Sequence, residues 1–477
     1  MGREIRADYE QTLMFPPSAE DWVGEDHPAR FIRDFVDALD LGRMGFMVPD
    51  SEVGRPGYAA DLLLKVWLYG YLNRIRSSRK LEQACRENMG LIWLTGMNTP
   101  DHSAIWRFWR DNKKRIREVF KKTIHVAVRS DLIGLALHAI DGTKIPAISS
   151  RDGVKNRETL KKLLKNLDRH IDTVMKEVEC AEKKENGEYR LSKAMSDKDK
   201  RKEAITRALD ELDDSERKVI HPGEPDARFM KTRRGLDLAY NGQIVADEKS
   251  GMIVAADVVR DETDSGQLVP MLDQVKEILG AVADENVADS GYYSTSQIGL
   301  AEKRKYEVLT SPPPNQTTMD KLLETNAYHP SRFTYDEERN CCICPHGYVL
   351  TYHQKKIKGA NKNEFIVFKC RDYKVCPHRW ECSKANHGRT IEISVHYKAV
   401  ETQRSKREEP EKKKQLGWRK VIAEPPFAWI KQGLEFRRWT VKGIENVRAQ
   451  WDLVCTALNL KKLYKTWLHG GLELRTI

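Results

Sequence analysis

Hydrophobic and polar positions follow two different periods along the chain. In the first 130 residues apolar side chains recur every three or four positions, as at Phe31, Phe35 and Leu39, and this spacing predicts helices. Between 235 and 310 short apolar runs are separated by turn residues, which predicts strands and a hairpin around 248–251. The pattern therefore predicts a multidomain α+β protein.

Changes in this pattern divide the chain into five segments. A highly charged stretch with two apolar stripes interrupts the strand-rich part, and it is typical of an antiparallel helical hairpin. This hairpin is expected to contact DNA, to mediate dimerisation or to act only as a spacer. The expected boundaries are 1–130 for a helical N-terminal domain, 131–155 and 220–310 for a sheet core, 156–219 for the hairpin insertion, 311–400 for a cysteine-rich insertion, and 401–477 for a C-terminal helical part. Within this last part, Pro425 and Pro426 fit the start of a helix that continues through apolar residues such as Phe427 and Ile430.

Positive charge is concentrated in one part of the chain. The 477 residues carry 82 Lys and Arg against 71 Asp and Glu, a net charge of +11, and residues 61–130 alone hold 15 basic and 6 acidic residues, a net of +9. Such a local excess favours contact with phosphates. A helix capped by Ser77 and Ser78 is followed by a tight polar segment and then by a long basic helix, which starts near 99–103 and continues to Phe120. This arrangement resembles a helix-turn-helix, with an ordinary helical bundle as the alternative. The basic helix offers Arg107, Arg110 and Lys114 as DNA contacts.

Two classes of protein are not expected from the composition. No apolar run approaches the roughly 18 residues that a membrane span needs. The first residues contain no apolar segment of the kind found in secretion signals. We therefore expect a cytoplasmic protein without membrane association, in which the nine cysteines are thiols or metal ligands and not disulfides.

Two aspartates directly follow short apolar runs. Asp141 follows residues 135–140, Asp289 follows Val287 and Ala288, and a small, flexible pair comes after each of them. Carboxylates at the ends of neighbouring strands are able to share divalent cations, because Mg²⁺ prefers oxygen ligands. The alternative is that each aspartate only caps a turn, which Asp-Gly sequences often do.

Seven short motifs appear in an order that identifies a family by resemblance. The chain resembles bacterial insertion-sequence transposases of the DDE class that have an InsH-like N-terminal domain. The matching segments are HPA at 27–29, GRPGY at 54–58, DGTKI at 141–145, DARFM at 226–230, ADSGY at 288–292, EPPF at 424–427 and GIENVR at 443–448.

This resemblance implies a fold and a metal site. The core would be a ribonuclease H-like α/β domain, with 401–477 as its C-terminal part that carries the glutamate helix. Asp141, Asp289 and Glu424 would form a triad that binds Mg²⁺ or Mn²⁺. Glu435 is a rival to Glu424, although its position in a basic run favours a salt bridge.

The resemblance also implies DNA contacts near the glutamate. Related families carry the signature Y-x₂-R-x₃-E-x₆-K, in which Lys431 matches the lysine and would hold a DNA phosphate. Arg437 and Arg438 would contact DNA as well. Lys420 and Gly417 stand at the Arg and Tyr positions, so the upstream half of the signature is incomplete.

The implied activity is transposition of an insertion sequence. Activated water would cut the phosphodiester at the terminal inverted repeats, and the freed 3′-hydroxyl would attack target DNA, with a homodimer holding two ends near the bacterial nucleoid. One alternative is a catalytically silent DNA-end-binding repressor derived from a transposase. A general metal nuclease is a third hypothesis, which the large N-terminal domain disfavours.

A cluster of cysteines follows residue 340. Structural zinc takes four Cys or His ligands, and Cys344, Cys370, Cys376 and Cys382 make one complete set. Cys342 is an alternative to Cys344, and further candidates are His346, His378 and His387. Unliganded or redox-active thiols are the competing interpretation.

Overall fold

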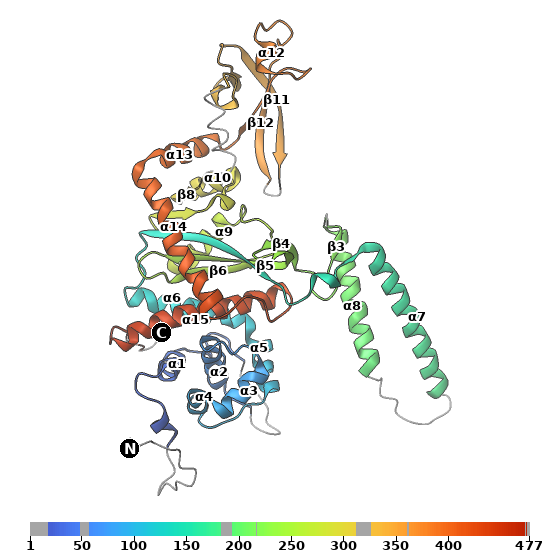
Figure 1. The fold of residues 1–477 in the computed structure, drawn as a ribbon, viewed down its shortest axis with the longest axis vertical. Coiled ribbons are helices and arrows are strands. Elements are labelled where there is room, and N and C mark those ends of the chain that lie inside the picture. The colour runs from blue at the N-terminus through green and yellow to red at the C-terminus, as the bar shows by residue number, and fades with distance from the viewer. Residues whose placement is uncertain are drawn as a thin grey trace, which may run out of the picture. The chain divides into compact units, whose positions relative to one another are not determined.

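The computed structural model describes residues 18–47, 57–182, 193–215, 217–311, 326–359, 362–472 and 474. The chain forms two compact units, each built from separate segments (Figure 1). Unit 1 contains Met1–Asp131, Ile430–Phe436 and Asp452–Ile477, and unit 2 contains Leu132–Trp429 and Arg437–Trp451. Most of the 54–58 motif, and the break between the two hairpin helices, lie outside the described residues.

Unit 1 is helical, as the apolar spacing predicted. Its helices are α1 (Pro28–Asp37), α2 (Ala60–Leu72), α3 (Ser78–Glu87), α4 (Met89–Leu94), α5 (His102–Asn112) and α6 (Ile116–Arg129), with 3₁₀ turns η1 (Ala19–Trp22) and η2 (Lys113–Arg115). Trp67 and Trp109 pack in its core with ring centroids 5.3 Å apart.

The link within the expected helix-turn-helix differs from the prediction. Helix α4 lies between α3 and α5, where the sequence suggested only a tight polar segment. It begins at Met89, and the side chain of its N-cap residue Asn88 accepts a hydrogen bond from the Leu91 amide at 3.1 Å. The basic helix is also shorter than expected, because the turn η2 separates α5 from α6.

A six-stranded sheet is the centre of unit 2. Its strands are β1 (Leu137–Pro146), β4 (Arg228–Thr232), β5 (Gly235–Asp247), β6 (Ile253–Val259), β7 (Glu285–Ala288) and β8 (Val308–Thr310). The order is β4-β5-β1-β7-β8, and β6 also pairs with β5. Strand β5 is antiparallel to β1, β4 and β6, whereas β7 is parallel to β1 and β8.

Helices cover both faces of this sheet. Helices α9 (Leu268–Leu279) and α10 (Thr295–Lys303) pack on the face that carries Ile140 and Ala288. Helix α14 (Pro410–Ala428) packs on the opposite face, where Ile422 and Ala423 contact Leu137 and its neighbours (Figure 1). The alternation of side chains along β1 therefore places Ala139 under α14 and Ile140 under α9.

The prolines of α14 correct one sequence prediction. Pro425 and Pro426 were expected at a helix start, but they lie inside α14, near its end. Proline lacks the N–H that continues the helical ladder, so its usual place is the first turn. Here the chain goes on into a π-helical turn, η6 (Trp429–Gly433), and the segment between Glu424 and Lys431 is not a regular α-helix.

Two insertions extend unit 2. Helices α7 (Arg157–Glu182) and α8 (Lys193–Asp213) form the hairpin, and Leu160, Ile205 and Ala208 are buried between them. A separate sheet in the order β13-β12-β11-β10-β9 carries the cysteines. Its strands are β9 (Thr334–Asp336), β10 (Cys341–Ile343), β11 (Val349–Lys358), β12 (Asn363–Lys369) and β13 (Thr390–Ser394).

The remaining elements are short or lie between these parts. They are strands β2 (Lys155–Asn156) and β3 (Val219–Ile220), 3₁₀ turns η3 (Arg151–Gly153), η4 (Ser290–Tyr292) and η5 (Pro330–Arg332), and helices α12 (Arg379–Cys382), α13 (Tyr397–Glu408) and α15 (Ile444–Leu468). In the part of the chain that the structure describes, no helix is both long and apolar enough to span a membrane.

Candidate active site

Asp141 lies within strand β1, which corrects the prediction that it follows the end of the strand. The strand continues to Pro146 because residues 142–146 go on pairing with β5. Asp141 shares its sheet face with Leu137 and Ala139, so its side chain is on the side that α14 covers. The Gly142 amide donates to its Oδ1 at 2.8 Å, and Arg419 Nη1 of α14 is 3.2 Å from its Oδ2.

Asp289 immediately follows strand β7. Its Oδ1 accepts a hydrogen bond from the Gly291 amide at 2.8 Å, so it caps the turn η4. Strands β1 and β7 are parallel, and Ile140 is paired with Ala288. An aspartate comes directly after each of these paired residues, so the structure brings the two predicted site residues side by side.

Asp141 is a largely buried carboxylate with other carboxylates nearby. Burial raises its pKa to about 6, and the nearby carboxylates of Asp289 and Asp264 add to this increase. Arg419 and the Gly142 amide act in the opposite direction but do not cancel the increase. A site with several carboxylates and a raised pKa favours the binding of a cation.

Asp264 is a third acid of this neighbourhood, and sequence reasoning missed it. It lies in the loop between β6 and α9, and the ammonium of Lys144 is 2.7 Å from each of its carboxylate oxygens. The loop is rich in acids and has no hydrophobic period, so nothing in the sequence separates Asp264 from Asp261 or Glu262. Its position becomes visible only in the fold, where β1 and β5 pair and the side chains that contact Asp264 come together.

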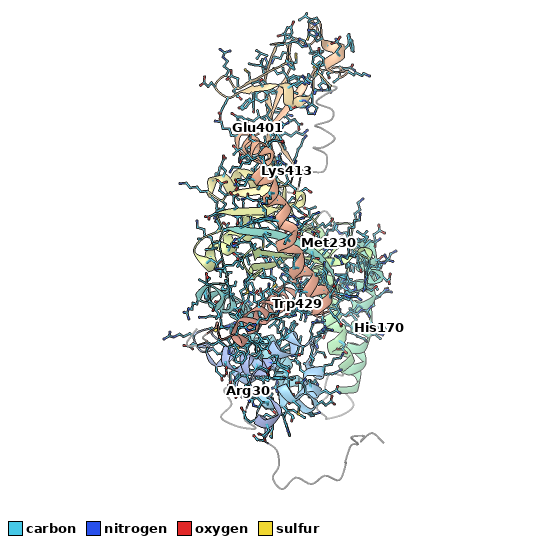
Figure 2. The ribbon with its side chains drawn as sticks, turned by 60° about the vertical axis from the view of Figure 1, so that its left-hand side comes forward. Arg30, His170, Met230, Glu401, Lys413 and Trp429 are labelled. Atoms are coloured by element: carbon cyan, nitrogen blue, oxygen red, sulfur yellow. The ribbon has the colours of Figure 1, made fainter. Side chains whose placement is uncertain are left out.

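Glu424, the third predicted acid, is exposed on α14. Arg419, five residues earlier, is the side chain of this helix that reaches Asp141. Figure 2 shows the course of α14, with Lys413 near its start and Trp429 just after its end. Within the described ranges, no group of three or more His, Cys, Asp or Glu side chains converges closely enough to hold a metal ion.

The basic residues after α14 have their own contacts. Arg438 Nε donates to the Ala147 carbonyl at 2.8 Å, while Lys431 lies in the turn η6 and Arg437 is exposed. Glu435, the rival acid, forms an ion pair with Arg74 at 2.7 Å. This pair agrees with the expectation that Glu435 takes part in a salt bridge.

Unit 1 has a surface hollow of about 440 Å³ between the N-terminal ends of α3 and α5. It is lined by Ser77, Ser78, Arg79, His102, Ser103, Trp106 and Arg107. Of the three DNA contacts predicted in this domain, only Arg107 lines the hollow. Arg110 instead binds Asp111 through two hydrogen bonds of 2.7 and 3.1 Å, and Lys114 lies exposed in the turn η2.

The four cysteines of the predicted zinc set lie near one another at one end of the second sheet. Burial raises the pKa of Cys382, and Cys344, Cys376 and Cys370 all add to this increase. Cys342 is fully buried in the core of the same sheet, which makes it a poor alternative ligand. The cluster nevertheless does not close around an ion, as the absence of a converging group among the described residues shows.

Two family models match the chain. A model described as a transposase DDE domain matches residues 343–464, and a model described as a transposase domain (DUF772) matches residues 17–111. Both matches support an insertion-sequence DDE transposase. The first match contains Glu424 and Lys431, whereas Asp141 and Asp289 lie outside both matched ranges. A search of curated proteins found no match.

Proposed function

We propose that this transposase cuts DNA at the ends of its insertion sequence and joins these ends to target DNA, with Asp141, Asp289 and Glu424 as its catalytic acids. The observation that carries the proposal is the pairing of β1 with β7, which puts two aspartates next to each other on parallel strands of a transposase-family chain. The sheet order, with antiparallel β6, β5 and β1 followed by parallel β7 and β8, supports a ribonuclease H-like core.

The donor set of the site fits a divalent cation such as Mg²⁺ or Mn²⁺. Mg²⁺ commonly uses only one or two protein carboxylates, together with water and phosphate oxygens. Asp141 and Asp289 would supply these carboxylates, and the repulsion between them favours the binding of a cation. Such a cation would supply the activation of water and the stabilisation of the leaving 3′ oxygen. We include Glu424 among the metal-binding acids because it stands at the glutamate position of the family signature.

Residues of α14 would position the DNA strand. Arg419 is held beside Asp141, where its guanidinium is able to donate two hydrogen bonds to a phosphate oxygen pair. Lys431, Arg437 and Arg438 are proposed to contact the DNA backbone. Arg419 would thus provide the cationic group that the family signature places one residue later, at Lys420.

The N-terminal hollow is proposed to contact the element ends. Arg79 and Arg107 supply positive charge, Ser77 and Ser103 supply hydroxyl donors, and Trp106 is 45% exposed beside them. The charged and hydroxyl groups are suited to bind a phosphodiester, and the exposed tryptophan is suited to contact an adjacent sugar or base. Synapsis of two ends further implies a homodimer.

Structural zinc at the cysteine cluster stays a proposal. Cys344, Cys370, Cys376 and Cys382 offer the right donors, but their side chains have to move closer to complete a tetrahedron. We expect about one zinc per chain in protein purified without chelators, and less in Cys382→Ser, by elemental analysis. An equal zinc content in wild type and Cys382→Ser would contradict this assignment.

The test of the function is cleavage of labelled DNA from the end of the element in the presence of Mg²⁺ or Mn²⁺. Wild type should cut, whereas Asp141→Asn, Asp289→Asn and Glu424→Gln should bind the same DNA without cutting it. Glu435→Gln is the matched control and should cut like wild type. Cleavage by Glu424→Gln at the wild-type rate would remove Glu424 from the site.

Two observations favour the silent end-binding protein as a second candidate. Glu424 is exposed and does not converge with the aspartates, and Asp141 is already paired with Arg419. If wild type binds the element ends tightly but never cuts them with either metal, this second candidate is the better account.

A further inference from the structure

Asp264 is the centre of a polar network beside the two aspartates. Besides Lys144, it accepts hydrogen bonds from Asn241 Nδ2 and Gln243 Nε2, at 2.6 and 2.7 Å from its Oδ1. Gln243 Nε2 also donates to Asn241 Oδ1 at 2.9 Å, and both amide side chains are fully buried. Three donors converge on Oδ1, counting Lys144, so this oxygen has no capacity left for a further partner.

The network packs directly against strand β1, which contains Asp141. Gly142 is paired with Gln243, and Lys144 with Asn241, so these four residues share the sheet face opposite Asp141. A Cβ atom at Gly142 would lie 2.4 Å from Gln243 Nε2 and 2.9 Å from Asp264 Oδ1. Only glycine at this position lets the network reach the backbone next to Asp141.

The same network reaches the turn that holds Asp289. The hydroxyl of Tyr292, at the end of η4, donates to Gln243 Oε1. A Cβ atom at Gly291 would lie 3.5 Å from Asp264 Oδ2. Asp264 and Gln243 therefore connect strand β1, strand β5 and the turn η4 in one set of hydrogen bonds.

We propose that Asp264 is a positioning residue, which fixes the separation of Asp141 and Asp289 at the distance where they bind a divalent cation. Asp264 does not hold the cation itself, because its Oδ1 is saturated and Lys144 also contacts its Oδ2. The inference rests on the proposed function, since it takes the two aspartates as the cation ligands.

The charge of Asp264 argues against a purely structural role. An amide or apolar side chain would fill the same space without placing a third carboxylate near Asp141 and Asp289. The Lys144–Asp264 pair is partly buried, and ion pairs taken out of water seldom add net stability compared with well-packed neutral groups. Residues that orient the ligands of a metal site commonly have this kind of environment, and their loss typically weakens metal binding about 10–100-fold.

The test compares Asp264→Asn with Asp261→Asn, a control in the same loop. The Asp264→Asn side chain keeps the shape and an acceptor for the two amides but loses the ion pair with Lys144. Binding of Mn²⁺ to the DNA-free protein is measured by electron paramagnetic resonance of the free ion, and cleavage is measured against Mn²⁺ concentration. We expect Asp264→Asn to bind Mn²⁺ roughly 10–100-fold more weakly and to need correspondingly more for half-maximal cleavage. DNA-end binding and the Asp261→Asn variant should match wild type.

Two outcomes would overturn the inference. One is Mn²⁺ binding by Asp264→Asn at wild-type affinity, and the other is an equal loss in Asp261→Asn. Tyr292→Phe, which removes one hydroxyl, is the second variant if Asp264→Asn does not fold, and unchanged Mn²⁺ affinity in it would likewise count against the network. If wild type binds Mn²⁺ but cuts no DNA, the proposed function fails while the Mn²⁺ comparison still decides the role of Asp264.

Discussion

Asp289 shows that the two interpretations of a strand-end aspartate do not exclude each other. It caps the turn η4 through the Gly291 amide, and it also lies next to Asp141 on the neighbouring strand. A carboxylate has four acceptor positions, so one amide leaves most of them for a cation. The same reasoning applies to Asp141, which accepts from the Gly142 amide.

The residues that sequence could not predict depend on contacts between distant segments. Asp141 and Asp289 were found because each follows an apolar run, which is local information. Asp264 gains its position from hydrogen bonds to Lys144 of β1 and to Asn241 and Gln243 of β5, two strands whose paired residues are about 100 positions apart in the chain. The motif alignment favours Lys420 as the signature cation, whereas the side chain that contacts Asp141 is Arg419, and this follows only from the packing of α14.

The raised pKa of Asp141 predicts the pH dependence of stability. The folded protein holds this proton more tightly than the unfolded chain, so the free energy of unfolding decreases as pH rises through the window from the ordinary value of 3.8 to about 6. Asp141→Asn avoids this loss. In metal-free buffer its Tm should be roughly 2–6 °C above that of wild type near pH 7.5, and the difference should shrink towards about pH 5.

The measurement is thermal unfolding with EDTA at both pH values. Asp237→Asn serves as the control, because Asp237 lies on the same sheet, in β5, away from the two aspartates. A Tm of Asp141→Asn that equals or falls below the wild-type value near pH 7.5 would contradict a pKa dominated by burial.

Among the secondary-structure elements, helix α14 both packs on the central sheet and contributes a side chain to the candidate site. One side of the helix packs on the sheet through Ile422 and Ala423, and the same side carries Arg419 to Asp141. The apolar pattern predicted a helix after residue 425, but the helix begins at Pro410. The first part of α14 is polar and charged, so its sequence shows little apolar periodicity from which a helix is predicted. Packing of the helix on the sheet supplies the stabilisation.

The packing of α14 gives a prediction about stability. Ile422 is 8% exposed against the sheet, whereas Val421 next to it is 72% exposed. Ile422→Ala should lower the free energy of unfolding by about 2–4 kcal/mol, because it removes buried methyl groups and leaves a cavity. Val421→Ala should change it by less than about 0.5 kcal/mol in the same urea titration. Equal effects of the two variants would show that α14 does not pack as described.

The ends of α3 and α5 give a prediction about DNA binding. Arg107→Ala should weaken binding to the element ends and reduce the salt slope of the logarithm of affinity by about 1, because one phosphate contact is lost. Arg110→Ala should have a smaller effect, since Arg110 already binds Asp111. Fluorescence anisotropy at several salt concentrations measures both. A larger loss in Arg110→Ala would place the DNA on the other side of α5.

At the scale of the whole molecule, the compact units do not follow the order of the chain. Residues 430–436 and 452–477 cluster with the N-terminal helices, while residues 437–451 belong with the sheet. Helix α15 therefore contributes to both units. Sequence patterns indicated which stretches are helical, but they carry no information on which distant stretches share a core, because that depends on long-range packing.

The central claim is that one site with Asp141 and Asp289 performs both DNA cutting and DNA joining. The most direct measurement supplies element ends that already carry a free 3′-hydroxyl and scores their joining to a plasmid in Mn²⁺. Wild type should join them, whereas Asp141→Asn and Asp289→Asn should bind them but form no joined product. Joining by either variant at the wild-type rate would contradict the account, because the chemistry would then take place elsewhere.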